Sequence, residues 1–289
     1  MSPETRRTAY IALIVALGGF LMGFDASVIA GVVGSIEVEF ALTKIQLGWS
    51  VSSLSLTATL GMLLSGPLSD RYGRRPVLMV AAVLFAISAV TSALAPDFLS
   101  FVLARMLGGF GVGAALIVAP MYIAEIAPPE QRGRMVSINQ LNIVIGISAA
   151  FFSNYLILAL GESGAPWTES IGLGEQGWRW MLAVEALPAI AYFLALFGVP
   201  ESPRWLVMQG RDDAAKAVVT RLRGPAQAEA LLVQVHDSLA AEEELGQVGF
   251  RALLHPSLRL VLTIGLAVGI LQQATGINAV FFYAPMIFE

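Results

Sequence analysis

Asp25 is the residue best suited to chemistry in this sequence, because it is a charged residue within an apolar run. No other charged residue lies between Arg7 and Glu37, and a carboxylate in hydrocarbon carries a large free-energy cost. Arg105 lies inside another apolar run of membrane length. From the helical rise, both residues fall roughly 10–14 Å below the same membrane surface. Opposite charges at one depth predict a buried ion pair.

Such a pair has two interpretations. It can be a static structural salt bridge, or it can open and close so that the carboxylate takes up and releases a proton. Glu185 is a second acid in an apolar run, and it can join this proton relay or have a structural role. The candidate proton-carrying residues are therefore Asp25, Arg105 and Glu185.

Amide side chains in apolar runs suggest a second kind of chemistry. An amide donates and accepts hydrogen bonds without burying a charge, which suits a neutral ligand rich in hydroxyl groups. Gln272 and Gln273 lie near mid-membrane by helical rise, and Gln140 lies in an earlier run. Asn278 is six residues beyond Gln272, and Gly276 between them can loosen the helix and turn both toward one cavity. The alternative role for such amides is hydrogen bonding between helices.

The composition predicts that membrane helices position these residues. Charged residues make up 13% of the chain and hydrophobic residues 56%, whereas soluble domains carry about 25% charged residues. There is no cysteine, which excludes disulfides and thiolate sites, and no metal or cofactor is expected. Seven apolar runs are long enough to span a bilayer: 8–34, 47–68, 77–95, 98–122, 136–160, 179–199 and 257–287.

The basic residues orient these spans. With the N-terminus inside, 14 of the 17 Lys and Arg residues fall in inner loops or at inner helix ends, and two in outer loops. This asymmetry predicts an integral protein of the inner or plasma membrane with a cytoplasmic N-terminus.

The predicted fold is all-α and polytopic. Residues 1–200 are expected to form a six-helix N-terminal bundle, and 257–289 a seventh helix that starts a C-terminal bundle. Residues 201–256 mix charged and apolar residues at helical spacing, so they predict a cytoplasmic linker of two or three short amphipathic helices; a solvated linker is the alternative. Six spans, a linker and one more span look like half of a twelve-helix plan plus the start of its second half.

The loop "GPLSDRYGRRP" at residues 66–76 joins two spans. Its basic residues can simply anchor the inner surface, or the loop can act as a latch that pairs with neighbouring helix ends. It fits the pattern G-x-x-x-D-R-x-G-R-R at every position, and the matching residues are Gly66, Asp70, Arg71, Gly73, Arg74 and Arg75.

This pattern resembles the signature loop of the major facilitator superfamily. Four more stretches, "RMLGGFGVG", "PMYIAEIAPPEQRGR", "PESPRWL" and "QQATGINAVFFYAP", resemble the sugar porter family within it. The resemblance covers essentially the whole chain and implies a twelve-helix carrier of sugars or polyols, here truncated after the seventh helix.

The resemblance also implies roles for single residues. Gln140, Gln272, Gln273 and Asn278 match substrate-binding positions, whereas Asp25 and Arg105 match the proton-coupling pair of the symporters. Phe24 and Phe282 stand where the family often has tyrosine, so these two candidate contacts lack a hydroxyl group. With the signature loop, a further set resembles the family's cytoplasmic charge network, which would hold the outward-open state: Glu125, Arg132, Glu201 and Arg204.

Together these features predict a proton-coupled symporter of a small neutral hydroxylated substrate, a sugar or polyol, working by alternating access in a lipid bilayer. They predict neither an enzyme nor a nucleic-acid-binding protein. Two alternatives remain: a facilitative uniporter in which the ion pair is structural, and a sugar sensor or half-carrier that does not transport. If the chain is a fragment, five more spans and a second loop of the signature type are expected.

Overall fold

The structure is a computed structural model that describes residues 3–245, 255, 258–277 and 280. These residues form helices and no strands, which confirms the all-α fold. The α-helices are α1 (Pro3–Val28), α2 (Val33–Glu39), α3 (Lys44–Tyr72), α4 (Arg74–Ala93), α5 (Phe98–Ile126), α6 (Arg132–Gly161), α7 (Pro166–Ser170), α8 (Gly177–Val184), α9 (Ala186–Leu196), α10 (Pro203–Met208), α11 (Asp212–Arg223), α12 (Pro225–Leu245) and α13 (Arg259–Ala274). Two 3-10 turns, Ile29–Gly31 and Pro129–Gln131, precede α2 and α6.

Six segments in the described part of the chain are long and apolar enough to cross a membrane: Arg6–Gly31, Lys44–Tyr72, Arg74–Ala93, Phe98–Ile126, Pro129–Gly161 and Gly177–Leu196. They correspond to the first six predicted spans. Helix α13, at the seventh, is a shorter apolar helix of 16 residues, and much of 275–287 lies outside the described residues.

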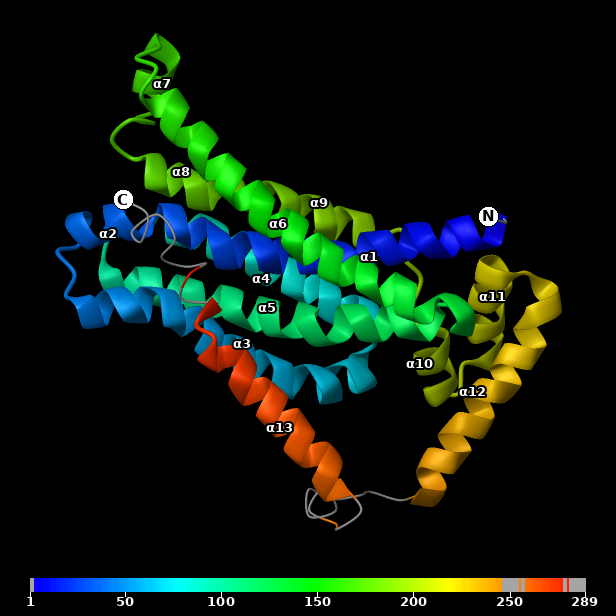
Figure 1. Ribbon diagram of the computed structural model, residues 1–289. Coiled ribbons are helices and arrows are strands. Elements are labelled where there is room, and N and C mark those ends of the chain that lie inside the picture. Colours follow the sequence, from blue (N-terminus) through cyan, green and yellow to red (C-terminus); the bar gives the residue numbers. More distant parts are fainter. Residues whose placement is uncertain (1–2, 246–254, 256–257, 278–279, 281–289) are drawn as a thin grey trace.

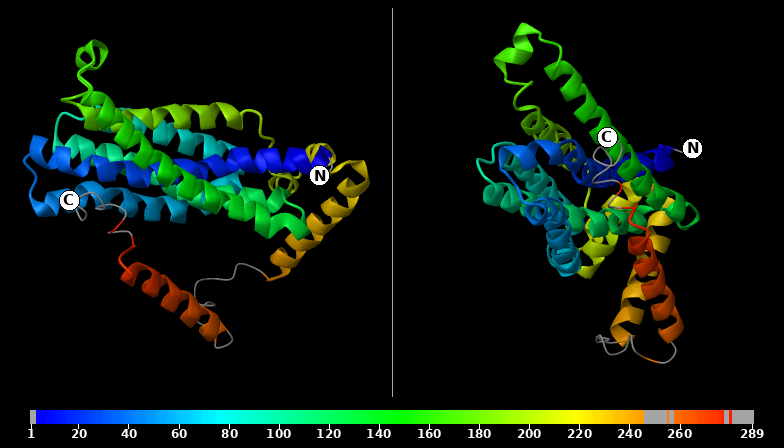
Figure 2. Two further views of the ribbon diagram at one scale, coloured as in Figure 1. Left: turned by 45° about the horizontal axis from the view of Figure 1, so that its top comes forward. Right: turned by 60° about the vertical axis from the view of Figure 1, so that its left-hand side comes forward.

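The six spans run alongside one another in a bundle (Figures 1 and 2), in which α5 packs against both α3 and α4 and α1 packs against α6. Helices α10, α11 and α12 gather at the end of the bundle where the chain begins. We call this end the arginine-rich end, because Arg7, Arg74 and Arg204 lie there. The short helix α7 projects from the opposite end (Figure 1).

The outer surface of the bundle is apolar. Large side chains such as Leu63 on α3, Val80 on α4 and Leu194 on α9 are exposed. An apolar surface spread over several long helices suits lipid rather than water. The chain is an integral membrane protein.

Glycines let α1 and α6 cross at very short range. Gly19 and Gly23 are spaced as Gly-x-x-x-Gly, the spacing that brings two membrane helices together. A Cβ atom on Gly23 would lie 2.1 Å from the carbonyl oxygen of Ile143, and one on Gly146 would lie 2.1 Å from that of Phe20. The backbones of the two helices are thus in direct contact.

Gly23→Ala is therefore expected to lower the free energy of unfolding by about 1–3 kcal/mol, because the added methyl group meets backbone that cannot rotate away. Gly48→Ala on α3 is the matched control, since nothing lies within 4 Å of a Cβ there; it should hold or slightly raise stability. Thermal unfolding of both variants in one detergent measures the difference. Equal melting temperatures would contradict the close crossing.

The glycine-rich stretch of α5 is a packing surface. Added Cβ atoms on Gly109 and Gly113 would lie 2.0 Å from the hydroxyl of Thr57 and 2.2 Å from the carbonyl oxygen of Ala58 on α3. The stretch therefore serves close helix packing.

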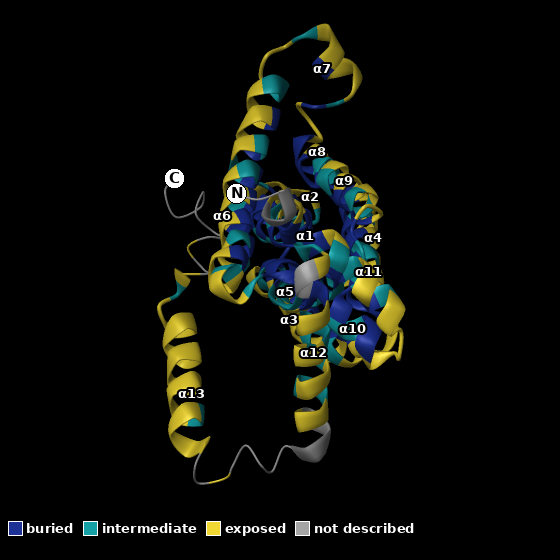
Figure 3. Cartoon of the chain, turned by 90° about the vertical axis from the view of Figure 1, so that its right-hand side faces the viewer, coloured by how far each residue is buried: buried dark blue, intermediate teal, exposed yellow. Residues whose placement is uncertain are grey.

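Helix α13 differs from the six spans in its surroundings. None of its described residues is buried, and the helix is exposed along its length in Figure 3. It is preceded by helices α10, α11 and α12, which occupy much of the predicted linker at 201–256.

Candidate functional site

Asp25 and Arg105 form an ion pair in the interior of the bundle. The Nη1 atom of Arg105 on α5 binds the Oδ1 atom of Asp25 on α1, and its Nη2 donates to the backbone oxygen of Asp25 over 3.2 Å. Asp25 is 1% exposed and Arg105 2%. The pairing predicted from their matching depth is present, and its part in proton coupling stays a prediction.

Glu185 lies beside this pair. It is 2% exposed and close enough for its charge to act on Asp25. The three groups hold two carboxyl groups and one guanidinium. One cation compensates one carboxylate, so a proton on the other removes an uncompensated charge from the bundle interior. The arrangement can therefore carry a proton.

The sequence around Glu185 explains how this side chain reaches the pair. The sixth span is divided at Glu185 into α8 and α9, a break that the sequence analysis did not predict. Pro188 causes the break, because its ring nitrogen cannot donate to the carbonyl oxygen of Val184 and its ring crowds that carbonyl.

Two atoms of the ion pair keep hydrogen-bonding capacity. Asp25 Oδ2 and Arg105 Nε are buried and make no hydrogen bond to the described residues. Gly108 opens the space on this side, since a Cβ there would lie 3.5 Å from Oδ2 and 2.5 Å from the hydroxyl of Ser88. Asp25 Oδ2 can therefore accept, and Arg105 Nε donate, one further hydrogen bond.

The predicted substrate residues are not brought together by the described part of the chain. Gln140 is exposed on α6, and Gln272 and Gln273 are exposed on α13. Phe24 is buried, with its ring 6.0 Å from that of Phe20. Asn278 and Phe282 lie outside the described residues.

Three buried amides escaped the sequence analysis. Asn139, Asn142 and Asn154 on α6 are each 4–6% exposed. Asn154 Nδ2 donates to the carbonyl oxygen of Val28 over 3.0 Å, where α1 ends. For two of them the signal was present in "INQLNIVIG", where Asn139 and Asn142 are three apart and share a helix face.

Arg74 organises the charges at the arginine-rich end. Its Nη2 lies 2.9 Å from Oε1 of Glu125, and its Nη1 lies 3.0 Å from Oδ1 of Asp70 and 3.0 Å from the carbonyl oxygen of Ser69. The Arg74 side chain is 3% exposed and that of Glu125 is 9% exposed. Three helices, α3, α4 and α5, are thereby joined through one guanidinium.

Glu201 binds the start of α4. Its Oε1 accepts from the backbone N–H of Arg74 over 3.0 Å and of Ser202 over 2.8 Å, and Arg75 N–H also donates to it. A carboxylate is stabilised at a helix N-terminus by free N–H groups and the helix dipole. Gly73 makes room: its φ is +102°, and a Cβ there would lie 2.4 Å from Oε2 of Glu201.

Burial raises the pKa of Glu201 above its ordinary value of 4.5, although the N–H groups of Ser202, Arg75 and Arg74 oppose the shift. A raised pKa means that the folded protein holds this proton more tightly than the unfolded chain does. The contribution of Glu201 to stability is therefore largest below pH 4.5 and falls as pH rises through the folded-state pKa.

Glu201→Gln is expected to remove this component of the pH dependence. The melting temperature of the unmodified chain minus that of the variant should decrease as pH rises from 4.5 upward. Thermal unfolding across this pH range measures it, with Glu229→Gln on exposed α12 as the control. A difference that increases with pH would contradict the shift.

The other signature-loop residues have separate roles. Arg75 donates from Nε to the carbonyl oxygen of Leu196 over 2.9 Å and from Nη2 to that of Phe197 over 3.2 Å, which satisfies carbonyls at the end of α9. The Arg71 guanidinium lies 5.2 Å from the ring centre of Tyr72. Gly66 lies on α3 with open space beside it.

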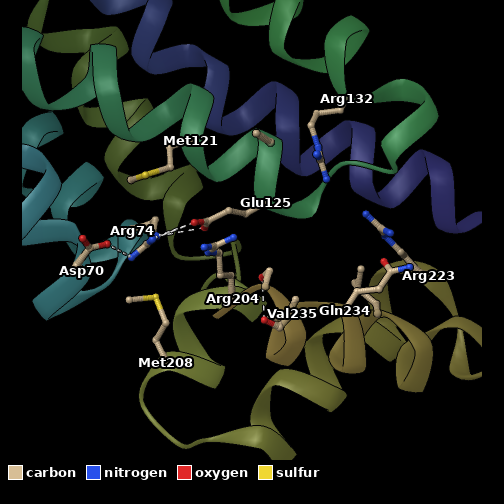
Figure 4. A pocket seen from close by; sticks show the side chains of 13 residues that line it. Asp70, Arg74, Met121, Glu125, Arg132, Arg204, Met208, Arg223, Gln234 and Val235 are labelled. Carbon is tan, nitrogen blue, oxygen red and sulfur yellow. Dashed lines mark hydrogen bonds and ion pairs between the residues drawn. The ribbon is translucent and has the colours of Figure 1, made fainter. Parts of the chain in front are cut away.

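A cavity of about 600 Å³ separates the bundle from the helices that follow it, and Figure 4 shows its lining. Arg132 from α6, Arg204 from α10 and Arg223 from α11 line it together with Glu125 and Asp70. Burial and the nearby charge of Arg132 lower the pKa of Arg223, whose Nη2 donates to the carbonyl oxygen of Ile126 over 3.0 Å. The cavity collects much of the predicted charge network.

Further contacts at both ends of the bundle were not predicted. Trp205 Nε1 donates to the carbonyl oxygen of Asp70 over 2.9 Å, and the Tyr122 hydroxyl donates to that of Pro200 over 2.8 Å, so both fix the start of α10. At the opposite end, Glu39 accepts from Trp178 Nε1 over 2.6 Å and from Arg179 over 2.7 Å. The partners in these contacts are more than 70 residues apart in the sequence, so no local sequence pattern predicts them.

The sequence profile of the sugar (and other) transporter family matches residues 11–289. The chain belongs to this family. This confirms the resemblance drawn from the signature loop and the four further stretches.

Individual proteins similar to this chain belong to the same group of sugar transporters. It is 40% identical over 279 residues to the arabinose-proton symporter of Bacillus subtilis, covering 96% of this chain and 58% of that protein. It is 36% identical over 305 residues to the D-xylose-proton symporter of Escherichia coli, covering 96% and 60%. The chain thus spans less than two thirds of the length of these relatives.

Solved structures show the same fold. The proton:xylose symporter XylE of the major facilitator superfamily, bound to 6-bromo-6-deoxy-D-glucose, superposes with a TM-score of 0.84 at 36% identity, over 98% of this chain and 63% of that one. The partially occluded inward-open XylE from E. coli gives 0.81 at 35% identity, over 96% and 66%.

Proposed function

We propose that this family member takes part in proton-coupled symport of a sugar or polyol by alternating access, as a transporter and not as an enzyme. The observation that carries the proposal is the buried pair of Asp25 and Arg105 with Glu185 beside it. A purely structural ion pair between Asp25 and Arg105 does not require a second buried acid. If Asp25 carries a proton, Glu185 is a group with which it can exchange that proton. The relatives include an arabinose-proton, a D-xylose-proton and a galactose-proton symporter, and these names support the substrate class.

In this mechanism the Asp25 carboxylate alternates between two partners. When it is ionised, Arg105 holds it; when a proton binds, the attraction to Arg105 weakens and the pair can open. Glu185 receives or supplies the proton over a short path. Asp25 lies on α1, Arg105 on α5 and Glu185 at the break between α8 and α9. Opening the ion pair therefore lets these spans change their positions relative to one another.

This mechanism also implies an orientation for the chain and a role for each of its segments. We place the arginine-rich end in the cytoplasm, since basic residues collect there. Residues 1–200 act as the N-terminal bundle, 201–256 as the cytoplasmic linker and 257–289 as the start of the C-terminal bundle. The cluster around Arg74, Glu125 and Glu201 holds the cytoplasmic helix ends together, and the amides Gln140, Gln272, Gln273 and Asn278 contribute to the sugar site.

Asp25→Asn is expected to abolish uphill sugar accumulation, because an amide cannot take up and release the proton. The chain reconstituted in liposomes with an imposed pH gradient is given labelled L-arabinose, D-xylose or D-galactose, and accumulation is measured with and without a protonophore. Asp213→Asn, on the exposed face of α11, is the matched control and should accumulate sugar like the unmodified chain.

The outcomes separate the competing functions. Accumulation that survives Asp25→Asn would overturn the role of this residue. Flux in the unmodified chain that a protonophore does not change would indicate a uniporter. Sugar binding without flux would indicate a sensor or a half-carrier that requires its second half.

A further inference from the structure

Two further arginines, Arg7 and Arg221, line a second cavity at the arginine-rich end, and this cavity shares no lining residue with the one around Arg74. Along the first turns of α1, Arg7, Tyr10, Ile11 and Ile14 follow at spacings of three and four residues, which place them on one helix face. Ile11 and Ile14 are largely buried, whereas Tyr10 is 65% exposed. The stripe thus begins with a cation and continues with apolar side chains.

Two other elements complete a cavity over this stripe. Ala195 lies in the last turn of α9 and Gly198 follows that helix, whereas Arg221 and Leu222 lie in the last turn of α11. Together with the stripe they line a volume of about 320 Å³. The hydroxyl of Thr8 donates to the carbonyl oxygen of Leu222 over 3.3 Å. This bond fixes the end of α11 against α1 and so fixes Arg221 near Arg7.

The two arginines leave the cavity with uncompensated positive charge. Neither Arg7 nor Arg221 makes a side-chain hydrogen bond or ion pair within the part of the chain that the structure describes. Both side chains are exposed. No acid lines this cavity among the described residues, so a bound anion would meet two guanidinium groups and no repelling carboxylate.

The depth of the cavity distinguishes it from a site for a soluble anion. The first membrane span begins at Arg6, so Arg7 lies at the membrane surface, whereas Ile14 lies about two turns deeper, in the hydrocarbon. A ligand that fills the cavity must present a negative charge at its outer end and apolar groups below. Basic pockets between membrane helices bind anionic lipid head groups in this manner.

We propose that this cavity, defined by Arg7, Tyr10, Ile14, Ala195 and Arg221, binds one anionic phospholipid from the leaflet at the arginine-rich end. The phosphate group lies between the guanidinium groups of Arg7 and Arg221, and the upper part of an acyl chain lies along Tyr10, Ile11 and Ile14. The lipid bridges a membrane span and a helix of the linker. This site is separate from the ion pair and from the cavity around Arg74, and it does not depend on transport.

The test measures lipid binding directly. The delipidated full chain in detergent is titrated with phosphatidylglycerol or phosphatidylcholine, and bound lipid is counted by native mass spectrometry. We expect one phosphatidylglycerol to bind in preference to phosphatidylcholine. The double variant Arg7→Gln/Arg221→Gln should weaken phosphatidylglycerol binding about 25-fold, from about five-fold for each arginine at the surface.

Two variants control for net charge and folding. Arg6→Gln/Arg211→Gln removes the same charge from the N-terminal turn of α1 and the start of α11 but leaves the cavity intact, so binding should be kept. Arg7→Lys/Arg221→Lys keeps both charges and should retain most of the binding.

Three results would overturn the proposal. One is equal loss of binding in the Arg6→Gln/Arg211→Gln control. Another is equal affinity for phosphatidylcholine and phosphatidylglycerol. The third is displacement of the lipid by excess inorganic phosphate, which would indicate a site for a soluble anion.

Discussion

Arg105→Gln is expected to lower the free energy of unfolding by about 3–5 kcal/mol, because it leaves the Asp25 carboxylate buried without its cation. Asp25 and Arg105 are both almost fully buried, so bulk water does not solvate the carboxylate in place of the lost guanidinium. Glu185, a second acid beside Asp25, offers no positive charge in place of the lost guanidinium. The measurement is equilibrium unfolding in mixed micelles of dodecyl maltoside and sodium dodecyl sulfate.

The double variant Asp25→Asn/Arg105→Gln separates the cost of an orphaned charge from the value of the pair. Removing both charges should recover much of the stability lost by Arg105→Gln alone, since neither group then carries a charge that needs a partner. Recovered stability without recovered sugar accumulation would assign the pair to function. A double variant as unstable as the sum of the two single variants would contradict the buried pair.

Arg74→Gln is expected to be the second most damaging change, with a loss of about 3 kcal/mol or more in the free energy of unfolding. The variant removes the hydrogen bonds that Arg74 Nε and Nη2 make to Glu125. It also leaves the carbonyl oxygen of Ser69, which now accepts from Nη1 over 3.0 Å, without that donor. Unfolding in the same mixed micelles measures the loss.

Arg71→Gln is the matched control for Arg74→Gln. It removes the same charge from the same loop, but Arg71 is exposed and its guanidinium lies over Tyr72. Its effect should stay within about 0.5 kcal/mol. Similar losses of unfolding free energy in the two variants would show that the loop acts only through its net positive charge. The contacts of Arg74 with Glu125, Asp70 and Ser69 would then be unimportant.

The buried ion pair could be predicted because helical rise converts residue count into depth. Asp25 and Arg105 are 80 residues apart, yet each lies at a countable distance from the same membrane surface. Glu185 could be predicted as an intramembrane acid. Its place at a helix break was missed, although Pro188 three residues later carries the signal.

The partners within the charge cluster could not be predicted from sequence. The signature loop offers three arginines, and nothing in their order says that Arg74 enters the interior while Arg71 remains outside. That choice depends on the turn at Gly73, which rotates the start of α4. The bond from Glu201 to this helix start joins residues 127 positions apart, and no local pattern reveals it.

The amides show a different limit. Asn139 and Gln140 are adjacent, so a helix turns them about 100° apart, and only the position of α1 decides which one is buried. Sequence reasoning chose Gln140 through the family resemblance, and the structure buries Asn139 against Gly19. The role of Gln140 in binding sugar stays a prediction, as does that of Gln272 and Gln273.

The tight crossing of α1 and α6 has a mechanical consequence. With no space for even a methyl group between Gly23 and Ile143 or between Gly146 and Phe20, the two helices cannot slide along each other, although they can tilt about the point of contact. Such a point is a fulcrum, where tilting displaces atoms least. Asp25 is two residues from Gly23, so a tilt of α1 about this contact would displace the backbone at Asp25 less than it displaces the helix ends.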